Sequence, residues 1–239
     1  MSPTTATSRT RSRGTLALLG GREWTEGCRA LDEELLAASG ATDVLVIPTA
    51  AAYERPARLV ERATAWFAEL GATVRPLPVL NRREAESDAN VSAARAARFL
   101  YVSDGSPLHL RSVLKGSALW EAMVAAYRDG AVLAASGAGA TVVCDPMVDP
   151  RGGAYTVGLG IVSNLAVFPY HGTTAAHLLE RSIELLPAGA VLAGIDETTA
   201  LVRAVSGEWR AAGDGAVTLY RRGGEGQPYR DEVVPTLTA

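Results

Sequence analysis

The alternation of short apolar runs with longer segments of helical periodicity, which starts at residue 15, constrains the fold most. Residues 15–19 and 43–47 are almost entirely apolar, as strands buried on both faces are, and Gly20 and Pro48 follow them. Residues 25–38 and 55–70 carry apolar side chains at the spacing of amphipathic helices. This order predicts parallel β-α units. We therefore expect a three-layer α/β fold in which a mostly parallel sheet has helices on both faces.

The remainder of the chain continues the same pattern. Further strands are expected at residues 73–79, 99–102 and 131–135, and a further helix at residues 173–186. No internal repeat or break in composition divides the sequence. We expect residues 14–239 to form one domain, preceded by a disordered tail over residues 1–13, which are rich in Thr, Ser and Arg.

Charge and composition limit the classes of partner. The 23 Lys and Arg residues nearly balance the 26 Asp and Glu residues, which gives no electrostatic reason to expect a nucleic-acid or membrane partner. No segment forms the uncharged apolar run of about 18 residues that a membrane helix needs. The two cysteines, Cys28 and Cys144, show no metal-ligand spacing. We expect a cytoplasmic protein without metal or cofactor, whose partner is a small molecule, and we leave open a homodimer.

The junction at residues 131–140 carries the clearest functional signal. An apolar strand runs there directly into Ser136, Gly137, Ala138 and Gly139. A strand that turns sharply into a helix through the pattern small-x-nucleophile-x-small holds the middle side chain above the edge of the sheet. In this chain the middle residue is Gly137, which has no side chain to act as a nucleophile. We expect Gly137 to adopt a backbone conformation that other residues avoid, and the helix after it to present N–H groups suited to an oxyanion.

Several motifs around this junction occur together in one known family. They are residues 20–21 (GG), 47–50 (IPTA), 110–117 (LRSVLKGS), 130–140, 158–161 (GLGI) and 194–200 (GIDETTA). Over residues 14–205 the chain resembles peptidase family S51, the serine peptidases related to dipeptidase E and cyanophycinase, within the class I glutamine amidotransferase-like superfamily. The resemblance implies the fold expected above and a hydrolase ancestry.

The resemblance assigns the catalytic triad of the family to specific positions of this chain. The nucleophilic serine falls on Gly137, the histidine on Tyr170 and the orienting acid on Glu197. A histidine, His171, stands one residue after the expected position. Only the acid is therefore retained in place.

The resemblance also implies an oxyanion site. The family loop Gly-Gly-Asp/Asn-Gln corresponds to residues 104–107, which read DGSP here, so its glutamine is absent. The backbone of Gly105 can still donate to an oxyanion. We expect Gly105 and Ser106 to form the pocket with Gly137 and Ala138.

Three hypotheses of function follow. The first is a homologue with a degraded triad that binds a small peptide or amino-acid-like ligand without ordinary serine-protease activity. The second is an active amide or peptide hydrolase in which Ser136, His171 and Glu197 form a triad shifted by one residue. The third is acid–base chemistry by His171 and Glu197 without a covalent intermediate. Arg151, in the loop at residues 145–153, is a further candidate as an anchor for an anionic group.

Overall fold

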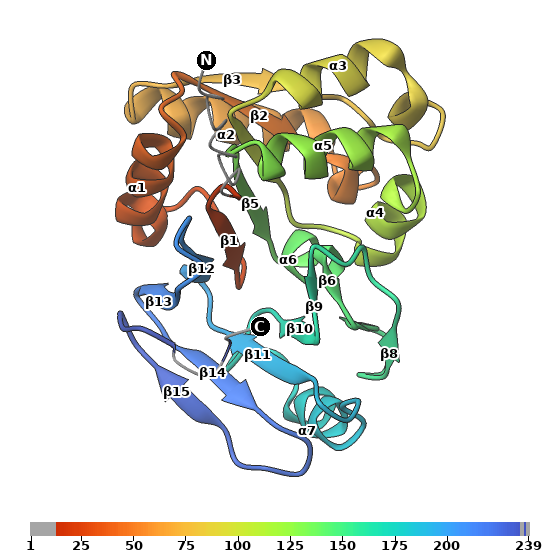
Figure 1. Ribbon diagram of the computed structural model, residues 1–239, viewed down its shortest axis with the longest axis vertical. Coiled ribbons are helices and arrows are strands. Elements are labelled where there is room, and N and C mark those ends of the chain that lie inside the picture. The colour runs from red at the N-terminus through yellow and green to blue at the C-terminus, as the bar shows by residue number, and fades with distance from the viewer. Residues whose placement is uncertain (1–12, 235–236, 238–239) are drawn as a thin grey trace, which may run out of the picture.

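The computed structural model describes residues 13–234 and residue 237 (Figure 1). Residues 1–12 of the expected disordered tail lie outside the described residues, and only Arg13 of that segment is described.

Five strands from the first 136 residues and two from near the end of the chain build a seven-stranded sheet, which confirms the predicted α/β class. Its strand order is β13 (Trp209–Gly213), β12 (Thr199–Arg203), β1 (Leu16–Leu19), β5 (Val132–Ser136), β4 (Phe99–Val102), β2 (Asp43–Ile47) and β3 (Thr73–Pro76). Strands β1, β5, β4, β2 and β3 run parallel. Strand β12 pairs antiparallel with β1, and β13 pairs antiparallel with β12. The edge strand β3 is shorter than the predicted 73–79 because Pro76 and Pro78 have no N–H for the ladder.

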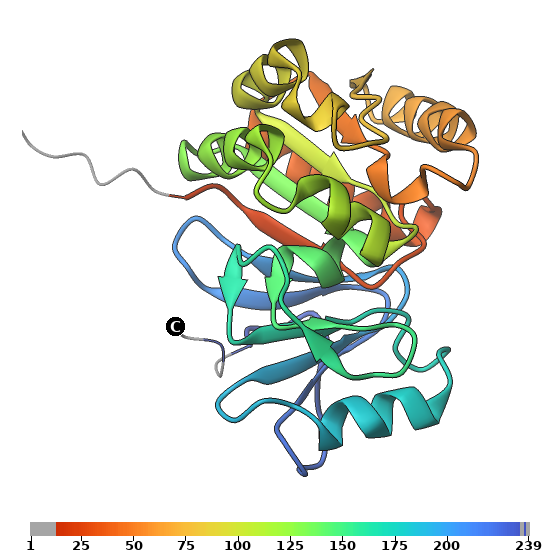
Figure 2. The ribbon, with the colours of Figure 1, turned by 90° about the vertical axis from the view of Figure 1, so that its right-hand side faces the viewer.

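Helices cover both faces of this sheet (Figures 1 and 2). One face carries α1 (Arg29–Ser39) and α2 (Pro56–Glu69), and the other carries α3 (Asp88–Ala96), α4 (Pro107–Leu114), α5 (Ala118–Arg128) and α6 (Ala138–Val143). Successive side chains of β1 alternate between the two cores: Ala17 and Leu19 pack with Trp66 and Phe67, whereas Leu18 packs on the other side. None of the helices in the described part of the chain is long and apolar enough to cross a membrane.

The second half of the chain builds a separate sheet that the sequence pattern did not reveal. Its order is β15 (Gln227–Tyr229), β14 (Val217–Tyr220), β11 (Val191–Ile195), β10 (Leu165–Phe168), β6 (Cys144–Asp145) and β9 (Val162–Ser163). A short pair, β7 (Met147–Val148) with β8 (Tyr155–Thr156), and helix α7 (Ala176–Glu184) complete it. The chain crosses back for β12 and β13 before it returns for β14 and β15, so the two sheets are interleaved and share one core (Figure 2).

The parallel strands bring three loops to one edge of the first sheet. Strands β1, β4 and β5 lie side by side and all end at this edge, so the segments that follow Leu19, Val102 and Ser136 come together there. The carboxyl edge of a parallel sheet is the usual place for ligand sites in such folds.

Candidate functional site

Gly137 forms the sharp turn between β5 and α6. Its backbone angles are φ 51° and ψ −110°, and its N–H donates to the carbonyl of Leu19 at 3.0 Å. A positive φ of this kind is one that residues with a side chain rarely adopt. The expected elbow conformation at Gly137 is therefore confirmed.

The carboxylate of Asp104 occupies the space directly in front of this turn. Its Oδ1 accepts hydrogen bonds from the backbone N–H groups of Gly105 and Ala138, each at 2.7 Å. The hydroxyl of Tyr170 donates to Oδ2 of the same carboxylate. A Cβ placed on Gly137 would lie 2.2 Å from Cγ of Asp104. The backbone donors expected to hold an oxyanion thus already hold an anion that belongs to the protein.

The sequence placed Asp104 in the loop at residues 104–107 but did not indicate this role. The available signal was its position two residues after Val102, the last residue of β4, next to the strand that leads to the elbow. Ser106, expected in the pocket, instead caps α4, since its hydroxyl accepts the N–H of His109 at 3.3 Å.

Ser136 points away from the elbow. Its side chain is fully buried, and its hydroxyl donates to Glu23 at 2.9 Å. Ser136 lies on the same face of β5 as Ala134, which packs in the core under α1 and α2. Burial, and next the nearby charge of Asp104, raise the pKa of Glu23. The serine is therefore held as a donor to a buried carboxyl group.

His171 is held in a different cluster, in the second sheet. Its Nδ1 lies 2.8 Å from Oδ1 of Asp196, and its Nε2 lies 2.8 Å from the hydroxyl of Tyr220. The ring rests against the backbone at Gly194, where an added Cβ would lie 2.4 Å from the ring Cδ2. Both ring nitrogens of His171 are consequently engaged.

The triad of Ser136, His171 and Glu197 is not assembled in the structure, which corrects the second hypothesis as it was drawn. Glu197 pairs with Arg22 at 3.2 Å and accepts a hydrogen bond from Thr173 at 3.4 Å. The acid beside His171 is Asp196, the neighbour of Glu197, in the turn between β11 and β12. The same bonds mean that His171 and Glu197 do not pair for the chemistry of the third hypothesis.

Tyr170, by contrast, does reach the elbow. It lies in the loop after β10, and through Asp104 its hydroxyl is connected to the turn at Gly137. Burial is the largest cause that raises the pKa of Tyr170, followed by its hydrogen bond to Asp104, so its phenol stays protonated at neutral pH. Two positions assigned by the family resemblance, Gly137 and Tyr170, therefore meet at one place.

A small pocket of about 210 Å³ opens beside Asp104. Its walls include Ala138 and Tyr170 from the elbow region, and Asp149 from the loop after β7. Arg151, considered as an anion anchor, forms a two-point ion pair with Asp149, its Nε at 3.0 Å from Oδ1 and its Nη2 at 2.5 Å from Oδ2, and does not line the pocket.

Within the described residues, no group of three or more His, Cys, Asp or Glu side chains is placed to hold a metal ion.

Comparison with known proteins identifies the family of this chain. The sequence model of peptidase family S51 matches residues 16–207. The chain belongs to this family. No curated protein is similar enough to count as a match.

Two solved structures are similar to this S51 member over most of its length. A peptidase from an acI-B1 Actinobacterium superposes with a TM-score of 0.85 at 27% identity, over 94% of this chain and 98% of that one. The candidate peptidase E of Listeria monocytogenes EGD-e superposes with a TM-score of 0.62 at 17% identity, over 87% and 98% of the two chains, and supports the fold alone.

Proposed function

We propose that this S51-family protein binds a small peptide or amino-acid-like ligand at the elbow pocket and forms no acyl intermediate on a serine. The observation that carries the proposal is the carboxylate of Asp104, which accepts the N–H groups of Gly105 and Ala138 in front of a residue without a side chain. Acyl transfer needs those donors free for the oxyanion of the substrate. With Asp104 bound there, the site has neither the free donors nor the nucleophile.

The charge of the pocket supports a ligand with a cationic group. Among the described residues, Asp104 and Asp149 are the charged side chains of its lining, and none of the lining side chains is basic. Asp149 is neutralised by Arg151, whereas no basic side chain of the described residues pairs with Asp104. An ammonium group, such as the amino terminus of a peptide, would complete that pair. The volume of about 210 Å³ is below the roughly 300–1,000 Å³ common for larger ligands, which favours a ligand of about amino-acid size.

The two hydrolytic alternatives have less support. Ser136 is buried against Glu23, and His171 is bonded to Asp196 and Tyr220, so a working triad would require both side chains to leave their partners. The pocket is lined by neither His171 nor Glu197.

Calorimetric titration with free amino acids and Asp-Xaa dipeptides tests the proposal. We expect binding that falls about tenfold or more when the ligand is N-acetylated or when the protein carries Asp104→Asn, because each change removes one charge of the pair. Asp43→Asn removes the same charge at the opposite edge of the sheet and should leave the affinity unchanged. Equal binding of acetylated and free ligands, or turnover of the dipeptides by the unmodified protein, would overturn the proposal.

A further inference from the structure

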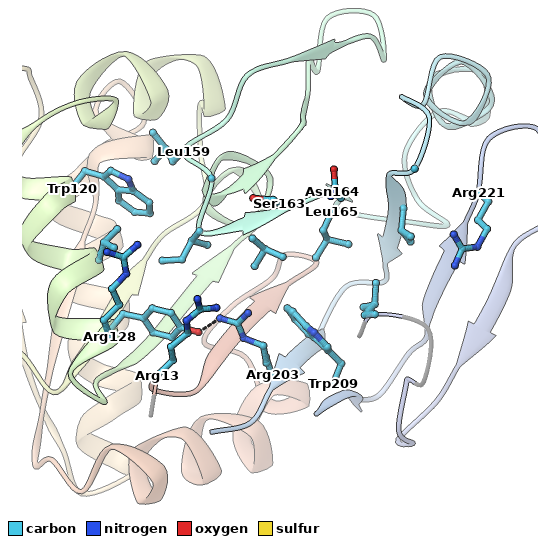
Figure 3. A pocket seen from close by; sticks show the side chains of 18 residues that line it. Arg13, Trp120, Arg128, Leu159, Ser163, Asn164, Leu165, Arg203, Trp209 and Arg221 are labelled. Carbon is cyan, nitrogen blue, oxygen red and sulfur yellow. Dashed lines mark hydrogen bonds between the residues drawn. The ribbon is translucent and has the colours of Figure 1, made fainter. Parts of the chain in front are cut away.

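A second and larger cavity lies at the opposite end of the first sheet. It has a volume of about 720 Å³ and is bounded by α5, by the starts of β10 and β11, and by the ends of β12 and β13 that meet at Arg203 and Trp209 (Figure 3). Leu16, the first residue of β1, pairs with Arg203, so this cavity is at the edge where the parallel strands begin. It shares no lining residue with the pocket at Asp104.

The charged residues of this cavity are all arginines. Arg13, Arg128, Arg203 and Arg221 line it, and among the described residues no Asp or Glu does. The whole chain has a net charge of −3, whereas the described lining of this cavity carries four positive charges and no carboxylate. The cavity should therefore attract anions, although the protein as a whole is slightly acidic.

Arg203 is the fixed element of this wall. Its residue is only 9% exposed, and its guanidinium donates to the hydroxyl of Tyr127. The guanidinium carbon also lies over two rings, 5.7 Å from the centroid of Tyr127 and 5.3 Å from that of Trp209 (Figure 3). The rings hold the side chain in one orientation, which lowers the entropic cost of using it to bind.

Arg203 also lacks a counter-charge. No carboxylate of the described residues forms an ion pair with it, although buried charges are normally paired because their desolvation is costly. Arg128 and Arg221 are exposed at the rim, and within the described residues no ion pair engages them either. An anion in the cavity would supply the missing charge for the buried guanidinium of Arg203 and the exposed ones of Arg128 and Arg221.

The remaining walls favour an organic molecule over a simple ion. Trp120, Leu159 and Val191 supply apolar surface, and Ser163 and Asn164 supply polar groups at the edge of β9. The volume of about 720 Å³ lies within the range of roughly 300–1,000 Å³ that is typical of small-molecule sites.

We propose that this arginine-lined cavity binds a small organic molecule with two or more phosphate or carboxylate groups, at a site separate from the elbow pocket. Guanidinium groups bind both kinds of oxyanion through paired hydrogen bonds, so the two chemistries share one requirement.

Titration calorimetry at low ionic strength with citrate, with pyrophosphate and with ATP, each alone, tests this site. We expect at least one of the three to bind and to raise the midpoint of thermal unfolding. A preference for citrate identifies carboxylate recognition and a preference for ATP identifies phosphate recognition, and either supports the proposal. Pyrophosphate that binds more tightly than both would contradict the requirement for an organic molecule. Failure of all three to bind would overturn it.

Variants at the rim keep the test independent of folding. Arg128→Gln and Arg221→Gln remove exposed charges and should together weaken binding by about tenfold or more. Arg203→Gln should abolish it, if that variant folds. Arg75→Gln, which removes the same charge beside Asp43 at the far strand β3, should bind as the unmodified protein does. An equal loss of affinity in Arg75→Gln, or no loss of affinity when Arg128→Gln and Arg221→Gln are combined, would contradict the site.

Discussion

The carboxylate of Asp104 stands where a side chain on Gly137 would have to be. A Cβ on Gly137 would approach Cγ of Asp104 to 2.2 Å, and the carboxylate is held there by two backbone N–H groups and by the hydroxyl of Tyr170. The absence of a side chain at residue 137 and the position of residue 104 are therefore coupled.

Gly137→Ala should be destabilising, and Asp104→Ala should relieve part of that cost. The substitution at Gly137 meets both a strained φ and the carboxylate, and we expect a loss of about 2–4 kcal/mol in the free energy of unfolding. In the Asp104→Ala background the loss should shrink by about 1 kcal/mol or more, as measured by denaturant unfolding of all four proteins.

Gly40→Ala is the matched control for that cycle. Gly40 has a φ of 62° but no atom within 4 Å of an added Cβ, so its cost comes from the backbone alone. The effects of Gly40→Ala and Asp104→Ala on the free energy of unfolding should therefore add. If Gly137→Ala is equally additive, Asp104 does not occupy the space in front of the elbow.

A fluorophosphonate probe should leave Ser136 unlabelled in the native protein. The hydroxyl is fully buried and donates to Glu23, so it is neither accessible nor activated by a histidine. Intact-mass measurement after incubation checks this, with Ser136→Ala as the control. Stoichiometric labelling that disappears in Ser136→Ala would restore the shifted triad.

Asp32 should make the protein less stable as the pH rises. Burial raises the pKa of Asp32 to about 7, against about 4 in the unfolded chain, and the nearby Glu23 adds to this increase. Below pH 4 the carboxyl is protonated in both states. Between pH 4 and 7 the carboxyl ionises only in the unfolded state, so the free energy of unfolding falls by up to about 4 kcal/mol. Above pH 7 the carboxyl is ionised in both states, and this loss of stability stays constant.

Asp32→Asn tests that sign. An amide cannot ionise and still offers an oxygen to the indole N–H of Trp66, which donates to Asp32 at 2.8 Å. The variant should be clearly more stable than the unmodified protein at pH 8 and nearly equal to it at pH 4, in chemical unfolding at the two pH values. The exposed neighbour Glu33→Gln is the control. A gain that is the same at both pH values would contradict the assignment.

Both cysteines should resist Ellman's reagent until the protein unfolds. Cys28 and Cys144 are fully buried free thiols, and burial raises the pKa of Cys28 to about 11 and that of Cys144 further still. Since the thiolate is the reactive form, the native protein should release almost no thionitrobenzoate, and the denatured protein should release two equivalents. Rapid reaction of either thiol in native buffer would show that the core around it opens.

Local sequence was sufficient for the parallel strands of the first sheet and for the elbow. A short apolar run indicates a buried strand whatever its neighbours in the fold are. The strands at residues 43–47 and 99–102 were therefore predicted with the same bounds as β2 and β4. The glycine at residue 137 also has a local meaning, because its own backbone angles already favour a residue without a side chain. The second sheet was missed because the pairing of β10, β11 and β14 into a sheet of their own is a tertiary property, and because β6 and β9, with two residues each, are too short for any periodicity.

The sequence by itself determined the fold class, the family and the place of the elbow, since each depends on the order of residues along the chain. The tertiary structure decided which side chains meet there. Asp104 and Tyr170 are 66 residues apart, and His171 takes Asp196 rather than Glu197 as its partner. Such contacts depend on how adjacent strands pair and on which face each side chain projects from, and no local pattern contains that information.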